Sequence, residues 1–191
     1  MSIDDRVYRT CTYLAGDWTN DHDAIEQIIK WNEGDKWSLH FNDVHKLTQS
    51  SDESNNCSIK ESLRKRLLVS KKFVLVVGDK TDDLRSGACY LCPYYKSYYV
   101  GMSLKYSCKH NLTIDNRSFV EYECEMAKLD YDNGKMEIVV LYNSCYVDKN
   151  KCPAILRNIG EHIPMKHKTL FLSREFTTWD YNAVKDAIEK K

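Results

Sequence analysis

FVLVVG, residues 73–78, is a run of five apolar residues closed by a glycine. Its length and its β-branched residues favour a strand, and the absence of polar alternation predicts burial of both strand faces. IVVL, inside MEIVVLYN (136–143), has the same character. Because strands buried on both faces are typical of parallel sheets, these two runs predict the centre of a parallel sheet and the α/β fold class.

Strands and helices alternate on both sides of this centre. Further strands are predicted at VYRTCTYL (7–14), WSLHFNDV (37–44) and TLFL (169–172). Helices are predicted at DHDAIEQIIKWN (21–32), SIKESLRKRLLV (58–69), FVEYECEMAKL (119–129), CPAILRN (152–158) and WDYNAVKDAIEK (179–190). Ser58 and Glu61 have the spacing of a capping box at the second helix. The pattern predicts a doubly wound sheet of five strands.

The spacing of the strands has one anomaly. The first three predicted strands begin about 30 to 36 residues apart, as successive βαβ units do, whereas the third and fourth begin about 60 residues apart. We interpret the excess as an insertion at residues 85–117, between the third strand and the next helix. This segment is rich in tyrosine and cysteine and has no clear helical period.

Length and composition predict a single domain spanning residues 1–191, since 42% hydrophobic and 12% aromatic residues suffice for one core. The 28 basic and 28 acidic residues balance, which argues against nucleic acid or an anionic membrane as a partner. An acidic start, and no run of about 18 apolar residues, predict a cytoplasmic protein. One basic cluster is expected to be the solvated side of a helix: Lys60, Arg64, Lys65, Arg66, Lys71 and Lys72.

The stretch SFVEYECEMAKL, residues 118–129, carries three glutamates that need different explanations. Ser118 and Glu121 have the spacing of a capping box. Glu121 and Glu125 share the polar face of the predicted helix, whereas Glu123 falls near the centre of the apolar stripe. Burying an unpaired carboxylate costs several kcal/mol, more than the ~0.3–1 kcal/mol that a helix N-terminus returns. Glu123 therefore either pairs with a buried donor or lines a polar pocket.

The expected topology favours the pocket. Ligands of open parallel sheets bind beyond the carboxyl ends of the strands, where the strand order reverses. In the common order 2-1-3-4-5 this crevice lies between strands one and three, and the helix of Glu123 follows strand three. Loops after the first three strands supply most candidates for substrate binding. The candidates are Tyr13, Asp17, Trp18, Asp43, His45 and Lys80.

The ordered series FNDVHKL, SIKESLRKRLLVSKKFVLVVGDKT, FVEYECEMA, MEIVVLYN and KCPAIL resembles the TIR-like proteins of the Thoeris anti-phage defence system. The resemblance covers most of the chain outside residues 85–117. It implies a three-layer, flavodoxin-like TIR fold with a five-stranded parallel sheet in the order 2-1-3-4-5. It also implies cleavage of the nicotinamide–ribose bond of NAD. The family's catalytic glutamate lies early in the helix after strand three, and Glu123 occupies that position.

The resemblance also implies the partners. NAD would be a substrate, with no resident cofactor, and a cyclic or modified ADP-ribose product would activate a separate effector protein. A phage component is a candidate trigger, and self-association on activation is expected because TIR sites are commonly completed by a neighbouring subunit. Ionised Glu123 would stabilise the positive charge that develops on the ribose.

Two other functions are compatible with the same residues. A non-catalytic TIR-like adaptor would act by self-association or partner binding, and its Glu123 would pair with a buried cation or amide. An enzyme that resembles a nucleoside deoxyribosyltransferase would also use a glutamate, with nucleosides in place of NAD.

The eight cysteines are expected to be free thiols or metal ligands, because no secretory signal is recognised. Cys89 and Cys92 form a C-x-x-C pair, and Cys108 and His110 follow within reach of a structural zinc site. The single residue between the last two is unusual for zinc, so no metal site is favoured over a packed, tyrosine-rich loop. The other cysteines are expected to be structural: Cys11, Cys57, Cys124, Cys145 and Cys152.

Overall fold

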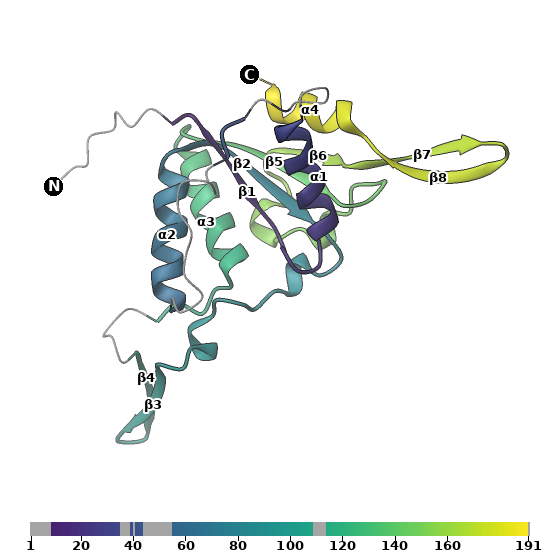
Figure 1. Ribbon diagram of the computed structural model, residues 1–191. Coiled ribbons are helices and arrows are strands. Elements are labelled where there is room, and N and C mark those ends of the chain that lie inside the picture. The colour runs from purple at the N-terminus through teal and green to yellow at the C-terminus, as the bar shows by residue number, and fades with distance from the viewer. Residues whose placement is uncertain (1–8, 35–38, 40, 44–54, 109–113, 191) are drawn as a thin grey trace.

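The computed structural model describes residues 9–34, 39, 41–43, 55–108 and 114–190. Its helices and strands are labelled in Figure 1. The helices are α1 (His22–Glu33), α2 (Asn56–Leu68), α3 (Phe119–Asp132) and α4 (Tyr181–Glu189). The strands are β1 (Cys11–Ala15), β2 (Ser70–Val77), β3 (Tyr95–Val100), β4 (Ser103–Cys108), β5 (Glu137–Tyr142), β6 (Glu161–Pro164), β7 (Lys166–Phe171) and β8 (Arg174–Trp179). None of the helices in these ranges has the length and apolar content needed to cross a membrane.

β2 is an inner strand of a four-stranded parallel sheet with the order β1-β2-β5-β6. Phe73 to Val77 are almost completely buried, and Val74 pairs with Leu14 on one side and Val139 on the other. A strand with neighbours on both edges and helices on both faces has no solvated side, and therefore shows no polar alternation. The interpretation of FVLVVG is confirmed.

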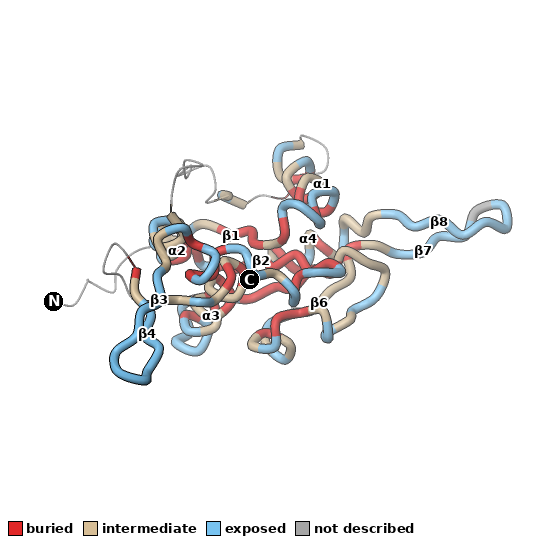
Figure 2. The backbone as a smooth tube through the Cα atoms, turned by 90° about the horizontal axis from the view of Figure 1, so that it is seen from below, coloured by how far each residue is buried: buried red, intermediate tan, exposed pale blue. Residues whose placement is uncertain are grey.

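Helices cover both faces of the sheet (Figure 1). α2 and α3 pack on one face, and α1 and α4 pack on the other. The side chains of β2 alternate between the two layers, with Phe73 and Leu75 toward α2 and α3, and Val74 and Val76 toward α1 and α4. Buried segments are concentrated in the central sheet (Figure 2). This layered arrangement is compatible with a flavodoxin-like TIR fold.

The predicted second strand, residues 37–44, is described only in part. Asp43 forms an isolated parallel bridge with Thr12 of β1, and the Thr12 amide donates to the carbonyl oxygen of Asn42 at 2.9 Å. These contacts place the segment beside β1, where the order 2-1-3-4-5 requires its second strand. The described residues form four parallel strands, so the fifth stays a prediction.

The last strand of the sheet is not the one we predicted. TLFL (169–172) lies in β7 and the following turn, and β7 pairs antiparallel with β8 in a hairpin that projects from the sheet (Figure 1). β6 takes the place beside β5. It has only four residues, EHIP, all half-buried. A segment this short, with mixed apolar and polar residues, carries little periodic signal. TLFL instead pairs with β8, the strand that follows it directly after a tight turn.

The helix predicted at CPAILRN (152–158) is wrong. The structure has two short 3₁₀ turns there, Lys149–Lys151 and Ala154–Leu156. Pro153 lies between the turns, lacks an amide hydrogen and disfavours the helical conformation at Cys152. Pro153 therefore keeps the two turns from joining into one α-helix.

The two predicted capping boxes have different outcomes. Ser118 caps α3 as predicted, since its Oγ accepts from the Glu121 amide at 3.1 Å and Glu121 Oε2 accepts from the Ser118 amide at 2.7 Å. The prediction for α2 is wrong, because Asn55 is the N-cap and its side chain accepts from the Ser58 amide at 3.0 Å. Asparagine caps a helix at least as well as serine, so α2 begins one turn earlier.

We expect Ser118→Ala to lower the free energy of unfolding by about 1 kcal/mol, because it leaves a helix amide without its side-chain acceptor. Denaturant unfolding measures the change. Ser58→Ala is the matched control, since the Ser58 hydroxyl does not cap a helix, and its effect should stay within about 0.5 kcal/mol. Equal losses in the two variants would show that the Ser118 cap does not stabilise α3.

The predicted solvated basic cluster is wrong for three of its members. Lys60, Arg66 and Lys72 are each at most 9% exposed. Lys60 Nζ donates to the carbonyl oxygen of Asp115 at 3.1 Å, and Lys72 Nζ donates to that of Ile188 at 2.7 Å. Long cationic side chains can pack their apolar stems inside when backbone oxygens receive the charged end. Arg66 faces the pocket described below.

Residues 85–117 contain a 3₁₀ turn, Cys89–Leu91, and the antiparallel hairpin of β3 and β4. The hairpin projects away from the sheet beyond the ends of α2 and α3 (Figure 1). Its side chains from Lys96 to Tyr106 are exposed. The hairpin therefore adds little to the main core.

Candidate functional site

A pocket of about 340 Å³ lies at the carboxyl ends of β1 and β2. Asp17 and Trp18 from the loop after β1 form one wall, and Ser86 from the segment after β2 forms another. Arg66 on α2 and Glu123 on α3 complete the wall under the two helices. This is the crevice expected from the strand order, since β1 and β2 are the first and third predicted strands.

Glu123 lies at the start of the second turn of α3 and is 7% exposed. Tyr13 Oη donates a hydrogen bond to Glu123 Oε1. Tyr13 is fully buried on β1, where its ring stacks on Phe73 with 5.7 Å between centroids. Burial, and then the charge of Glu123, raise the pKa of Tyr13 well above its usual value, so the phenol keeps its proton and acts as a donor. Glu123 thus has a buried donor and also lines a pocket.

The start of α3 is held against the segment after β2. The Phe119 amide donates to the carbonyl oxygen of Ser86 at 2.7 Å. Gly87 has a φ of +100°, and a Cβ at this position would lie 2.5 Å from the Phe119 ring. Only glycine tolerates both conditions, and this close approach brings Ser86 into the same wall as Glu123.

Asp17 lines the pocket, but its carboxylate shapes its own loop. Its Oδ1 accepts from the amides of Thr19 and Asn20 at 2.9 and 3.2 Å, and its Oδ2 accepts from the Asn20 side chain. Burial opposes the charge of Asp17, but these hydrogen bonds outweigh it and lower its pKa. Trp18, 44% exposed, borders the same pocket, where an indole suits stacking on a planar base.

Two further predicted substrate-binding residues that the structure describes, Asp43 and Lys80, do not line the pocket wall. Asp43 is half-buried beside β1 and adds, after burial and Glu123, to the rise in the pKa of Tyr13. Lys80 is exposed, and its charge contributes, after the hydrogen bonds, to the low pKa of Asp17. His45 lies outside the described residues.

Our sequence reasoning missed Arg66, which is 9% exposed and faces the pocket from α2. Ile59 and Leu63 line the same pocket. The three residues lie at positions i, i+4 and i+7, which share one helical face, and this spacing was the available signal. A guanidinium in a pocket wall is suited to carboxylates and phosphates.

Of the four candidate zinc ligands, the structure describes Cys89, Cys92 and Cys108, and His110 lies outside the described residues. The three cysteines are buried and do not line the pocket of Glu123. Any metal chemistry at these residues would therefore be separate from the pocket.

The parallel sheet, the two helical layers and the pocket at the strand ends define an α/β protein whose architecture fits the TIR-like class. Residues 11–86 match the family model described as Thoeris protein ThsB, TIR-like domain. The predicted resemblance to this family is thereby confirmed over this part of the chain. The match includes Tyr13 and Arg66 and ends before Glu123. A comparison with curated proteins gave no match.

We expect Tyr13→Phe to lower the free energy of unfolding by about 1–3 kcal/mol, because it removes a donor from a buried carboxylate. Tyr142→Phe is a matched control, since the Tyr142 hydroxyl pairs with His162 Nδ1 at 2.9 Å, away from the pocket. That loss should be about 0.5–1.5 kcal/mol, as for a neutral hydrogen bond. A Tyr13→Phe loss no larger than the control's would show that Tyr13 does not support Glu123.

Proposed function

We propose that this protein is a TIR-like enzyme that cleaves the nicotinamide–ribose bond of NAD. The product would be a cyclic or modified ADP-ribose that activates a separate effector in Thoeris defence. The observation that carries the proposal is the position of Glu123, a buried carboxylate in the wall of a pocket at the carboxyl ends of β1 and β2. Self-association and a phage-derived trigger belong to the same proposal.

The dimensions and the residues of the pocket support this substrate. Its volume of about 340 Å³ is at the lower end of the range for small-molecule sites, so the nicotinamide riboside half would enter and the rest of NAD would extend outside. Trp18 offers a stacking surface for the nicotinamide ring. Arg66 offers a guanidinium for the phosphates.

The chemistry requires a carboxylate and no acid. The bond between ribose C1′ and the nicotinamide nitrogen breaks with both electrons leaving on nicotinamide, which departs as a neutral molecule. Positive charge then develops on the ribose. Water or an adenine nitrogen of the same molecule supplies the electron pair for the new bond, and one proton is released to solvent.

In this scheme Glu123 stabilises the developing positive charge by preorganised electrostatics. Tyr13 holds the carboxylate in place through its hydrogen bond to Oε1. Since burial keeps Tyr13 protonated, the hydrogen bond persists over the neutral pH range. Tyr13 is thus a positioning residue, and Glu123 is the residue that contacts the reacting sugar.

One observation favours the adaptor as a second candidate. Glu123 accepts from a buried phenol of the same chain, which lowers the cost of burying its carboxylate without any substrate. A protein that works only through self-association would also need a buried donor for the Glu123 carboxylate. The adaptor predicts that the pocket has no turnover and that Glu123 serves stability alone.

The test uses mass spectrometry to measure the small molecules in phage-infected cells that express the protein. We expect nicotinamide release and a new ADP-ribose derivative that is absent from cells without the protein. The purified protein is also incubated with NAD and with a panel of nucleosides, in parallel. Turnover of nucleosides alone would favour a deoxyribosyltransferase, and no turnover in infected cells would favour the adaptor.

A further inference from the structure

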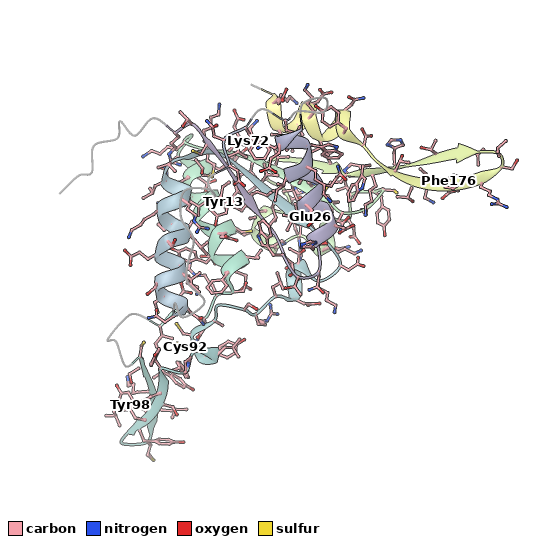
Figure 3. All side chains as sticks on the ribbon, viewed as in Figure 1. Tyr13, Glu26, Lys72, Cys92, Tyr98 and Phe176 are labelled. Carbon is pink, nitrogen blue, oxygen red and sulfur yellow. The ribbon has the colours of Figure 1, made fainter. Side chains whose placement is uncertain are left out.

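Four cysteines lie on segments that come together at the base of the β3–β4 hairpin, although these are three separate parts of the chain. Cys89 begins the 3₁₀ turn, Cys92 follows it and Cys108 ends β4. The Tyr95 amide donates to the carbonyl oxygen of Cys92 at 3.0 Å, and Tyr95 pairs with Cys108 in the hairpin register. The hairpin thus brings Cys108 close to Cys92, which lies at its base in Figure 3.

The fourth thiol comes from α2. Asn56 Nδ2 donates to the carbonyl oxygen of Ala88 at 3.0 Å, which joins the first turn of α2 to the residue before Cys89. Cys57 is the next residue of that turn. Cys57 lines one cavity together with Asp115, whose amide donates to Cys89 Sγ at 3.2 Å. These contacts place Cys57 near Cys89.

Apolar packing does not explain this convergence. From residue 85 to residue 108, the buried residues are Gly87, Ala88 and the three cysteines Cys89, Cys92 and Cys108. The strands carry exposed side chains, such as Tyr98, which lies out on the hairpin in Figure 3. An isolated two-stranded hairpin is at best marginally stable in water, so a cross-link at its base would stabilise this one.

We propose that Cys57, Cys89, Cys92 and Cys108 bind a structural zinc ion that fastens the hairpin to the start of α2. Four cysteine ligands, two of them in a C-x-x-C pair, are a common structural zinc set. Binding converts four thiols to thiolates and releases four protons for each Zn²⁺, with no change in oxidation state. Cys57 takes the place that our sequence reasoning gave to His110.

Two details of the surroundings fit a metal site. The Asp115 amide donates to Cys89 Sγ at 3.2 Å, the kind of outer hydrogen bond that orients a ligand. Cys57 lines a cavity of about 670 Å³ between α2 and the segment before α3, which gives an ion a path to the thiols. Among the described residues, no three side chains already have metal-binding spacing, so the thiols must rotate about χ1 to close around the ion.

The site has a consequence for the pocket of Glu123. Ser86 lies three residues before Cys89 and accepts a hydrogen bond from the first amide of α3. A metal that fixes Cys89 would therefore also fix one wall of that pocket. Zinc removal should loosen this wall, even though the ion takes no part in the chemistry.

The full chain, purified under reducing conditions, is expected to hold about one zinc per molecule by elemental analysis. Cobalt in place of zinc should give the intense thiolate charge-transfer and visible absorption bands of a tetrahedral four-sulfur site. This measurement uses the wild-type protein and requires no variant. Cys57→Ser should weaken zinc binding more than about 100-fold in a chelator competition. Cys145→Ser is the matched control, because Cys145 contacts Thr177 beside the other hairpin, and it should bind zinc as the wild type does.

His110→Ala separates the two possible fourth ligands. We expect it to retain zinc and the four-sulfur cobalt spectrum. Loss of zinc in His110→Ala with retention in Cys57→Ser would overturn the proposal, as would a wild-type protein that takes up neither zinc nor cobalt. A cobalt spectrum of three sulfur ligands would exclude Cys57 and overturn it as well.

Discussion

Glu123→Gln should lower the rate of nicotinamide release from NAD by about 10²- to 10³-fold, the usual cost of removing one group that stabilises charge in the transition state. The fold should survive, because the glutamine carbonyl oxygen can still accept the hydrogen bond from Tyr13 and glutamine occupies nearly the same volume. Initial rates and denaturant unfolding, measured on the same preparations, separate loss of chemistry from loss of structure.

Glu121→Gln is the matched control for Glu123→Gln. It makes the same chemical change two residues earlier, at the solvated end of the capping box, where glutamine also caps. Its activity and stability should both stay near the wild-type values. Undiminished release by a folded Glu123→Gln protein would remove Glu123 from the chemistry. Unfolding of this variant would instead support the structural role that the adaptor requires.

Arg66→Met should raise the KM for NAD about 10- to 100-fold with a smaller effect on kcat. A charge-assisted hydrogen bond contributes about 1.5–3 kcal/mol, and each 1.4 kcal/mol is a factor of ten in affinity. Methionine retains an apolar stem in the pocket wall, which Leu63 also lines. Steady-state kinetics over a range of NAD concentrations measure the change.

Lys65→Met is the control for Arg66→Met, because Lys65 is the preceding residue on α2 and its ammonium pairs with Glu61 in solvent. Such surface pairs contribute ~0–1 kcal/mol, so KM should be almost unchanged. A fall in kcat with an unchanged KM in Arg66→Met would mean that Arg66 acts on Glu123 and not on the phosphates.

Local patterns predicted the central part of the fold. FVLVV and IVVL are apolar throughout because β2 and β5 are inner strands of the sheet. The helices at α1, α2, α3 and α4 were also predicted, since their periodicity reflects which side is buried. The errors fall where the signal is short: β6 has four residues, and TLFL is as apolar as a sheet strand although it forms a hairpin.

The residues of the candidate site were also predicted only in part. Glu123 could be recognised because a carboxylate inside an apolar stripe is costly and needs a reason. Arg66 was assigned to solvent, because a basic cluster gives no sign of which of its members turns inward. Asp17 was recognised as a pocket residue, but only the structure shows that its carboxylate is engaged by Asn20.

The sequence by itself determined the class of fold, the resemblance to TIR-like proteins and the inward position of Glu123, because each follows from local periodicity or from an ordered series of motifs. The tertiary structure alone decided the partners: Tyr13, 110 residues away along the chain, for Glu123, and Ala88 for Asn56 at the start of α2. Such pairs depend on how helices and strands pack across the sheet. The local sequence pattern around a residue shows whether its side chain is buried, but it does not show which distant residue the side chain contacts.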